Sequence, residues 1–268
     1  MWEHHSVQRL LMALVACSLI ASACGASADS TPIEMPDWQT IIDATRAIEP
    51  VQVTVEVLVE LDEEAAGGSA ITGVGDWSIA LADITLFEPL TDTALSRVVV
   101  NGDVSYVLSS APDFTRALPE GREIVRVPTA QIVESGMIPD DIESLTGVLG
   151  LLSGARNAMH RNDGSVRVDI DLAAAVAAMT ANESDGLDVA FTDLTDVVAV
   201  SDVTLSADAS TIERFRVRIE ANQNDAEFLL TASVDVTAVD SPLRFDPPVE
   251  ALVVDLADVP AIRPMLTR

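Results

Sequence analysis

Residues 51–61, Val-Gln-Val-Thr-Val-Glu-Val-Leu-Val-Glu-Leu, alternate apolar and polar side chains, and only Leu58 interrupts the polar series. Successive side chains of a β-strand point to opposite faces, so this period of two predicts one apolar face and one hydrated face. Buried parallel strands are apolar on both faces, whereas antiparallel sheets commonly keep one face in water. The stretch therefore predicts an antiparallel sheet with a core on one side only.

Further stretches along the chain are predicted to be strands of the same sheet. They lie at residues 76–84, 96–100, 104–108, 123–127, 166–170, 203–205, 212–221 and 226–236. Asn101-Gly102 separates two of them and predicts a tight hairpin, because both positions accept a positive φ. Residues 62–68, which are acidic and contain glycine, and the stretch around His160 are predicted to be loops.

Three helices are expected among these strands. Asp37 is placed to cap a short helix whose apolar side includes Trp38 and which ends before Pro50. Residues 139–153 have acidic side chains in their first turn and apolar ones at helical spacing, and residues 172–181 are rich in alanine. Strands with helices inserted among them predict an α+β domain.

The first apolar run of the chain ends at Ile20-Ala21-Ser22-Ala23-Cys24. Residues 10–23 suit the core of a signal peptide and fall short of the ~20 residues that span a bilayer as a helix. Small residues before a cysteine are typical of lipoprotein signals, in which the thiol receives a diacylglyceryl group. We expect Cys24 to become a lipidated N-terminus on the extracytoplasmic face of the cell membrane. The alternative is an ordinary secretory signal in which Cys24 is a chance cysteine.

These features divide the chain into four parts. Residues 1–23 are a lipoprotein signal peptide, 24–36 a tether, 37–256 a single domain and 257–268 an extended C-terminal tail. A domain of this length can bury enough surface to fold without disulfides. None is expected, because Cys17 leaves with the signal and Cys24 carries the lipid.

The charge balance is strongly acidic. The chain has 15 basic and 43 acidic residues, a formal net charge of −28, and no lysine. Such a surface repels nucleic acid and anionic lipid head groups at long range. No nucleic-acid partner is therefore expected, and attachment to a membrane would rely on the acyl anchor.

No pattern in the chain indicates an enzyme, a metal site or a bound cofactor. After residue 23, His160 is the one histidine, and Ser153 stands one position too late in Gly150-Leu151-Leu152-Ser153-Gly154 for a nucleophile elbow. Ser153 is interpreted as the end of a helix before a glycine. Zinc and calcium motifs are missing, and the acidic residues 60–64 are interpreted as a solvated loop.

Three parts of the chain together resemble a known family. They are Ala21-Ser22-Ala23-Cys24, the hairpin Val98-Val99-Val100-Asn101-Gly102-Asp103-Val104-Ser105-Tyr106, and the closing hairpins at residues 203–248. In these parts the chain resembles the LppX/LprG-type lipoproteins of actinobacterial envelopes, distant structural relatives of the LolA/LolB carriers. The resemblance implies a strongly curved antiparallel half-barrel sheet with helices on its concave face. It also implies an apolar cavity that binds or transfers an acylated lipid or lipoglycan.

Under this interpretation the acyl chains lie between the sheet and the helices. The residues expected to line the cavity are Val55, Val57, Leu149, Val176, Met179, Phe215, Val217, Ile219, Phe228 and Leu230. Arg214, Arg216 and Arg218 line one strand face and could meet an anionic head group at the cavity mouth. More often such a row pairs with carboxylates across the sheet, for example Glu227 or Asp235.

The alternative function is a non-catalytic envelope interaction module that holds a protein partner on the outer face of the sheet and has no cavity. The alanine-rich residues 172–181 bear on this choice. They offer little bulk to fill the space beside so many apolar strand faces, which favours a cavity. The same alanines would also let the helix approach the sheet closely at normal packing density.

Replacing Cys24 tests the anchor. Cys24→Ala should abolish acyl labelling and move the protein out of the membrane fraction, because the thiol is the acceptor of the diacylglyceryl group. Metabolic labelling with an alkyne fatty acid and membrane fractionation measure the two effects. An unmodified Cys24 in a mature protein that starts at another residue would contradict the prediction.

Overall fold

The computed structural model describes residues 30–88, 91, 93–135, 146–179, 191, 193–224 and 226–266. Cys24 and the predicted signal lie outside the described residues, as do residues 139–145 and 180–181 of two predicted helices. The described strands are β1 (Ser30–Pro32), β2 (Val51–Leu61), β3 (Glu64–Asp76), β4 (Leu81–Glu88), β5 (Thr93–Asn101), β6 (Val104–Ser109), β7 (Ile124–Pro128), β8 (Ala155–Arg161), β9 (Val166–Ile170), β10 (Leu194–Leu205), β11 (Ile212–Gln223), β12 (Ala226–Ala238) and β13 (Val253–Asp255).

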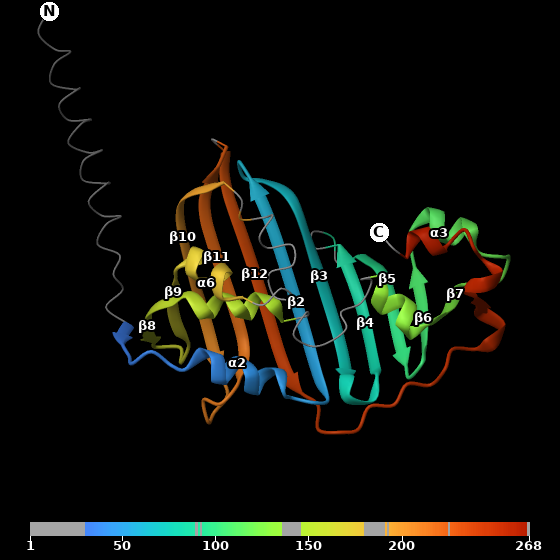
Figure 1. Cartoon of the computed structure of the whole chain (residues 1–268), viewed down its shortest axis with the longest axis horizontal. Coiled ribbons are helices and arrows are strands. Elements are labelled where there is room, and N and C mark those ends of the chain that lie inside the picture. The colour runs from blue at the N-terminus through green and yellow to red at the C-terminus, as the bar shows by residue number, and fades with distance from the viewer. Residues whose placement is uncertain are drawn as a thin grey trace, which may run out of the picture.

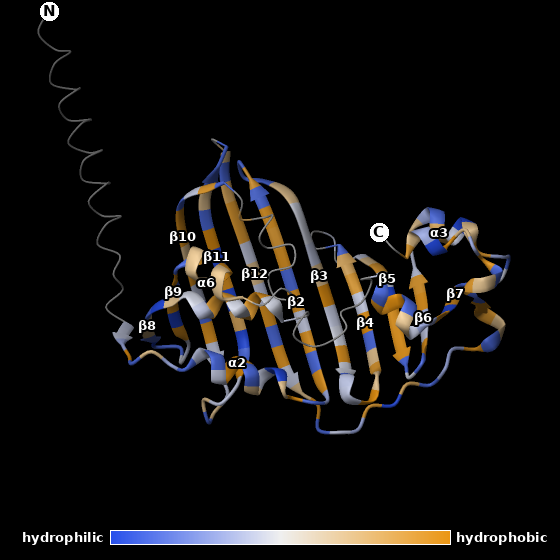
Figure 2. Cartoon of the chain, viewed as in Figure 1, coloured by the Kyte–Doolittle hydropathy of each residue, from blue (hydrophilic) through white to orange (hydrophobic). Residues whose placement is uncertain are grey.

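These strands form one large, open sheet (Figure 1). Their order is β1-β8-β9-β10-β11-β12-β2-β3-β4-β5-β6-β7-β13, and β13 is the one described strand that pairs in parallel, with β7. Figure 2 shows hydrophilic and hydrophobic bands alternating along β10, β11, β12 and β2. The antiparallel sheet predicted from residues 51–61 is thus confirmed in its broad form, whereas the half-barrel curvature stays a prediction.

Short helices cover one face of this sheet in two groups (Figure 1). The first group is α2 (Trp38–Arg46), the 3-10 helix η2 (Gly147–Gly154) and α6 (Leu172–Ala178). The second is α3 (Pro112–Ala117), α4 (Thr129–Glu134) and the 3-10 helices η4 (Leu256–Asp258) and η5 (Arg263–Met265). The remaining 3-10 helices are η1 (Trp77–Ile79) and η3 (Glu250–Leu252). Among the described residues, no helix is long and apolar enough to cross a membrane.

The two groups of helices bury two apolar clusters on the same face of the sheet. One row of cross-strand partners runs through both clusters, namely Val53, Gly73, Ile84, Val98, Val107 and Val125. The first cluster contains side chains of β2, of the five strands β8 through β12, and of the helices α2, η2 and α6. The second cluster contains side chains of the four strands β4 through β7, of the helices α3 and α4, and of the C-terminal segment. We call this side of the sheet the helix face and the other side the outer face.

Trp77 connects the two clusters across β3. Its half-buried indole packs against both of them. A Cβ atom built on Gly75 would lie 2.3 Å from Cζ3 of this ring, so any side chain at that position would displace the indole. Glycine in the strand therefore gives the ring a place to lie against the backbone.

Several predicted elements are confirmed at residue level. β2 and β9 have the predicted bounds. Asp37 caps α2, because its carboxylate accepts a hydrogen bond from the backbone N–H of Thr40 at 3.3 Å. Both closing strands, β11 and β12, extend a few residues beyond their predicted ends.

Other predictions are wrong. Residues 64–68 belong to β3 and not to a loop, because they pair with the far end of β2. Within residues 76–84, η1 forms a turn before β4 begins. His160 lies in β8, which β9 and β1 hold on its two sides. The C-terminal segment is not extended: Val259, Ile262 and Leu266 are buried in the second cluster.

The predicted hairpin between β5 and β6 exists, but its turn lies one residue later than expected. Asn101 pairs with Val104, so the two loop residues are Gly102 and Asp103. Gly102 alone of the two takes a positive φ, 63°. The predicted turn at Asn101-Gly102, with both residues at positive φ, is therefore wrong, because the strand keeps Asn101 in its ladder.

Gly102 can be tested against a glycine that has no such constraint. Gly102→Val should lower the free energy of unfolding by about 1–3 kcal/mol, because a β-branched residue is strained at positive φ. Gly67→Val is the control, since a Cβ on either glycine meets nothing within 4 Å but only Gly102 has a positive φ. Urea denaturation measures both variants. Equal stability of the two would contradict this account of the turn.

Candidate functional site

The predicted cavity-lining residues come together in the structure. Buried in the first cluster are Val55, Leu149, Phe215, Val217, Ile219, Phe228 and Leu230, with Val57, Val176 and Met179 packed against it and partly buried. Seven of them come from the helix faces of β2, β11 and β12, and three from η2, α6 and the residue after α6. The sequence thus identified one contiguous apolar region between sheet and helices.

The alanine-rich helix α6 packs closely against η2. A Cβ atom on Gly154 of η2 would lie 2.8 Å from Cβ of Ala175 and 2.3 Å from the carbonyl oxygen of Asp171. Ala175 is fully buried at this contact. Small residues therefore let α6 approach η2 closely at this contact.

Hydrogen bonds at its first turn hold α6 in this position. The carboxylate of Asp171 accepts from the backbone N–H of Ala174 at 3.2 Å and also binds the guanidinium of Arg156. The Ala174 hydrogen bond, and then the Arg156 guanidinium, hold the pKa of Asp171 below its ordinary value. In addition, the backbone N–H of Asp171 donates to the carbonyl of Gly154 at 2.8 Å.

Burial on the helix face decreases along β2 toward its hairpin with β3. Val51, Val53 and Val55 are buried, whereas Val57, Val59 and Leu61 are only partly buried. Ile71 of β3 and Leu86 of β4 continue this region beside the second cluster. We call these five residues, Val57, Val59, Leu61, Ile71 and Leu86, the apolar stripe. They form an apolar surface on the helix face that the two clusters do not fully bury.

Gly67 leaves room beside this stripe. It pairs with Val59 across the β2–β3 ladder, and a Cβ atom built on it meets nothing within 4 Å. Sequence reasoning missed Val59, Leu61 and Gly67. The apolar alternation of β2 already assigned the first two to the core side, but their partial exposure depends on which parts of the sheet the helices reach.

Ser201 adds one polar group to the first cluster. Its side chain is 1% exposed, and its Oγ has no hydrogen-bond partner among the described residues. Its cross-strand partner Val217 is one of the predicted cavity residues. A buried hydroxyl without a partner costs about 1–3 kcal/mol. Ser201 is therefore a candidate to bind a polar atom held within this core.

The three arginines predicted to meet a head group lie on the outer face. Arg214, Arg216 and Arg218 alternate along β11 with the buried Phe215, Val217 and Ile219. Since the sheet separates the two sets, one ligand cannot place its acyl chains in the cluster and its head group on these guanidinium groups. The predicted position at a cavity mouth is therefore wrong.

Cross-strand and same-strand carboxylates bind two of these arginines. Arg214 forms an ion pair with Asp235 of β12, as the alternative interpretation expected. The guanidinium of Arg218 lies 2.6 Å from a carboxylate oxygen of Glu220 on the same strand. These pairs are solvent-exposed, so each contributes little to stability.

The described residues contain little that suggests chemistry. No group of three or more histidine, cysteine, aspartate or glutamate side chains among them could hold a metal ion. Ser153 donates its hydroxyl to the carbonyl of Gly150 at 2.7 Å, inside η2. This bond agrees with its interpretation as a residue at a helix end.

Comparison with known proteins gives weak likenesses only. No protein-family model matches the chain, and no curated protein matches it. A LolA superfamily protein from Nitrosomonas europaea is 9% identical and aligns over 76% of this chain and 94% of its own, with a TM-score of 0.28. A polyketide dehydratase domain, PpsC of Mycobacterium tuberculosis, is 13% identical over 80% of this chain and 88% of its own, with a TM-score of 0.17. Superpositions this loose carry no argument, and the resemblance to LppX/LprG-type lipoproteins stays a prediction.

A pair of tryptophan variants tests the packing of α6. Ala175→Trp should lower the free energy of unfolding by about 1–3 kcal/mol or more, because Gly154 leaves no space for the ring. Ala178→Trp, on the exposed side of the same helix, should change it by at most about 0.5 kcal/mol. Thermal and urea unfolding measure both. A stable Ala175→Trp protein would show that a cavity lies beside α6 after all.

Proposed function

We propose that this protein is a non-catalytic, lipid-anchored protein of the cell envelope that binds an acylated lipid or lipoglycan on the helix face of its sheet. Cys24 carries the anchor, and the mature domain is exposed on the extracytoplasmic side of the membrane. The acyl chains lie along the apolar stripe and extend between the sheet and the helices, which occupy the concave side of a curved sheet.

The observation that carries this proposal is the partly exposed apolar stripe beside the open space at Gly67. Soluble domains gain by burying such surface, and each CH₂ group of a ligand buried there contributes ~0.8 kcal/mol. Ser201 supports the proposal as a hydrogen-bonding group within the adjoining cluster. Transfer of the lipid to another carrier or membrane is an extension of the same binding step.

Filling the space beside Gly67 tests the proposal. Organic extracts of the purified Cys24→Ala protein, which has no lipid of its own, should contain an acylated lipid by mass spectrometry. Gly67→Trp should lower the amount of this lipid several-fold, because the indole occupies the place of an acyl chain. The variant should keep the stability of the parent, since a side chain at this position meets no neighbour within 4 Å.

Thr237→Trp is the matched control. Thr237 is exposed on the outer face of β12 in the same sheet, so its variant should retain the full amount of lipid. A parent protein without extractable lipid, or equal lipid in the Gly67→Trp and Thr237→Trp proteins, would end the lipid-binding hypothesis. An interaction module would then be the better interpretation of the fold.

A further inference from the structure

Ser201 of β10 carries a buried hydroxyl group that the described residues leave unpaired. Its neighbours along the strand, Val200 and Asp202, line a groove on the outer face, so strand alternation turns Ser201 toward the helices. Its side chain is 1% exposed, and its Oγ has no hydrogen-bond partner among the described residues. The large majority of buried polar groups in folded proteins have a partner, so this hydroxyl needs an explanation.

The other buried hydroxyl groups of the described residues have partners. The hydroxyl of Thr45 accepts a hydrogen bond from the backbone N–H of Ile212 at 2.8 Å. In the other half of the sheet, Oγ of Ser105 lies 3.0 Å from Oγ1 of Thr129. Among the buried hydroxyl-bearing residues that the structure describes, Ser201 is the one without a partner.

A row of cross-strand partners on the helix face connects Ser201 with the apolar stripe. Ser201 lies beside Val217 of β11, and Val217 lies beside Ala232 of β12. Ala232 in turn lies beside Val57 of the stripe. Neighbouring strands are ~4.8 Å apart, so Ser201 lies roughly 14 Å from Val57 along the row. An extended acyl chain can cover this distance, and Ala232 contributes only a methyl group on the way.

The 3-10 helix η2 packs on this part of the sheet through apolar contacts. It contacts β9 and β12, which flank β10 and β11. The segment has no charged side chain, and the hydroxyl of Ser153 donates to the carbonyl groups of Gly150 and of Ala175 in α6. Since hydrophobic contacts are not directional, an acyl chain can replace those between η2 and the sheet without loss of these hydrogen bonds.

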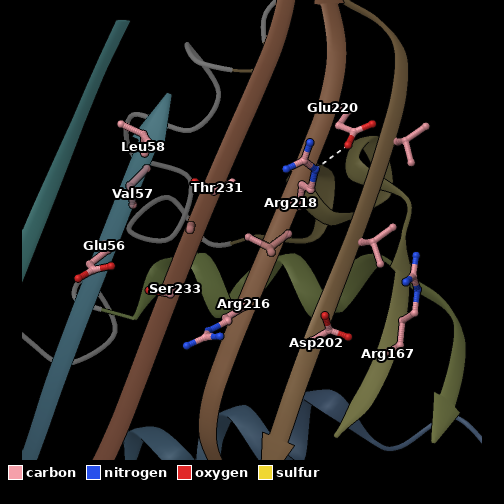
Figure 3. Close-up of a pocket in the computed structure, with 14 residues that line it drawn as sticks. Glu56, Val57, Leu58, Arg167, Asp202, Arg216, Arg218, Glu220, Thr231 and Ser233 are labelled. Carbon is pink, nitrogen blue, oxygen red and sulfur yellow. Dashed lines mark hydrogen bonds and ion pairs between the residues drawn. The ribbon is translucent and has the colours of Figure 1, made fainter. Parts of the chain in front are cut away.

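The charged side chains of the neighbouring strands lie on the opposite face of the sheet. Figure 3 shows them in front of the strands, with helices behind: Glu56, Arg167, Asp202, Arg216, Arg218 and Glu220. No charged residue is buried among those the structure describes. A charged group beside Ser201 would therefore lack a counter-ion, and its desolvation would be costly. The surroundings of Ser201 favour an uncharged polar group.

We propose that Ser201 donates a hydrogen bond to the uncharged carbonyl oxygen of an acyl ester, whose hydrocarbon chain lies along the row toward the apolar stripe. This inference rests on the proposed lipid binding. It adds the position of the ligand's polar end and the selection of an ester over an ionised fatty acid. A serine hydroxyl can donate to a carbonyl oxygen, and the bond gives a partner to a group that is unpaired in the free protein.

Binding of radiolabelled probes to the delipidated Cys24→Ala protein tests this role of Ser201. The probes are methyl laurate, which has an uncharged carbonyl, laurate at neutral pH, and dodecane, which has no polar group. The parent should bind methyl laurate at least about tenfold more tightly than laurate. Ser201→Ala should weaken the binding of methyl laurate about tenfold and leave that of dodecane unchanged, because it removes the donor and keeps the apolar row.

Ser105→Ala is the matched control, because Ser105 carries a buried hydroxyl with a partner. It should leave all three affinities unchanged and lower the Tm by about 2–4 °C, whereas Ser201→Ala should not lower the Tm. Equal affinity of the parent for methyl laurate and laurate, or unchanged binding of methyl laurate by Ser201→Ala, would overturn the role of Ser201. The Gly67→Trp comparison would then still decide on lipid binding itself. Failure of all three probes to bind the parent would overturn both proposals.

Discussion

The structure depends on covering one face of a single sheet. All thirteen described strands belong to this sheet, and most of their buried side chains lie on the same side. A smaller cluster of Tyr106, Ile124 and Val253 is buried on the outer face, at the edge formed by β6, β7 and β13. Exposed apolar surface costs roughly 25 cal/mol per Å², so an uncovered face of this width would be unstable. The helices that cover it are short, with nine residues in α2 and seven in α6. They bury two separate clusters, and Trp77 packs against both, with its ring over Gly75 of β3.

Among the described residues, the apolar stripe near the middle of the helix face is less completely buried than the two clusters beside it. α6 and η2 pack against one another at the distance that Gly154 and Ala175 allow, so little space remains there. Toward the β2–β3 hairpin, Val59 and Leu61 have less cover. A ligand with acyl chains would bury the apolar surface that the helices leave partly exposed. The hydrophobic effect would then drive both folding and ligand binding.

The two faces of the sheet carry different chemistry. The helix face is apolar and has Ser201 as its unpartnered polar group among the residues described. The outer face has exposed ion pairs, such as that of Arg214 with Asp235, and the exposed side chain of Val198 in β10. These two sets of side chains lie on opposite faces, because successive side chains of a β-strand point to opposite sides of the sheet. A ligand on one face therefore cannot reach the side chains of the other.

The sequence by itself determined the features that depend on local interactions: the bounds of β2 and β9, the Asp37 cap of α2 and ten of the apolar residues in or against the first cluster. The alternation in β11 also determined that its arginines and its core residues face opposite sides, although the head-group hypothesis overlooked this. Only the tertiary structure decided that Glu64 to residue 68 and the stretch around His160 are strands, because pairing with β2 in the first case, and with β9 and β1 in the second, overrides a polar local sequence. The tertiary structure also decided which arginines form ion pairs with carboxylates. It decided as well which apolar residues of the helix face stay partly exposed. Both properties depend on contacts between strands and helices that no local pattern encodes.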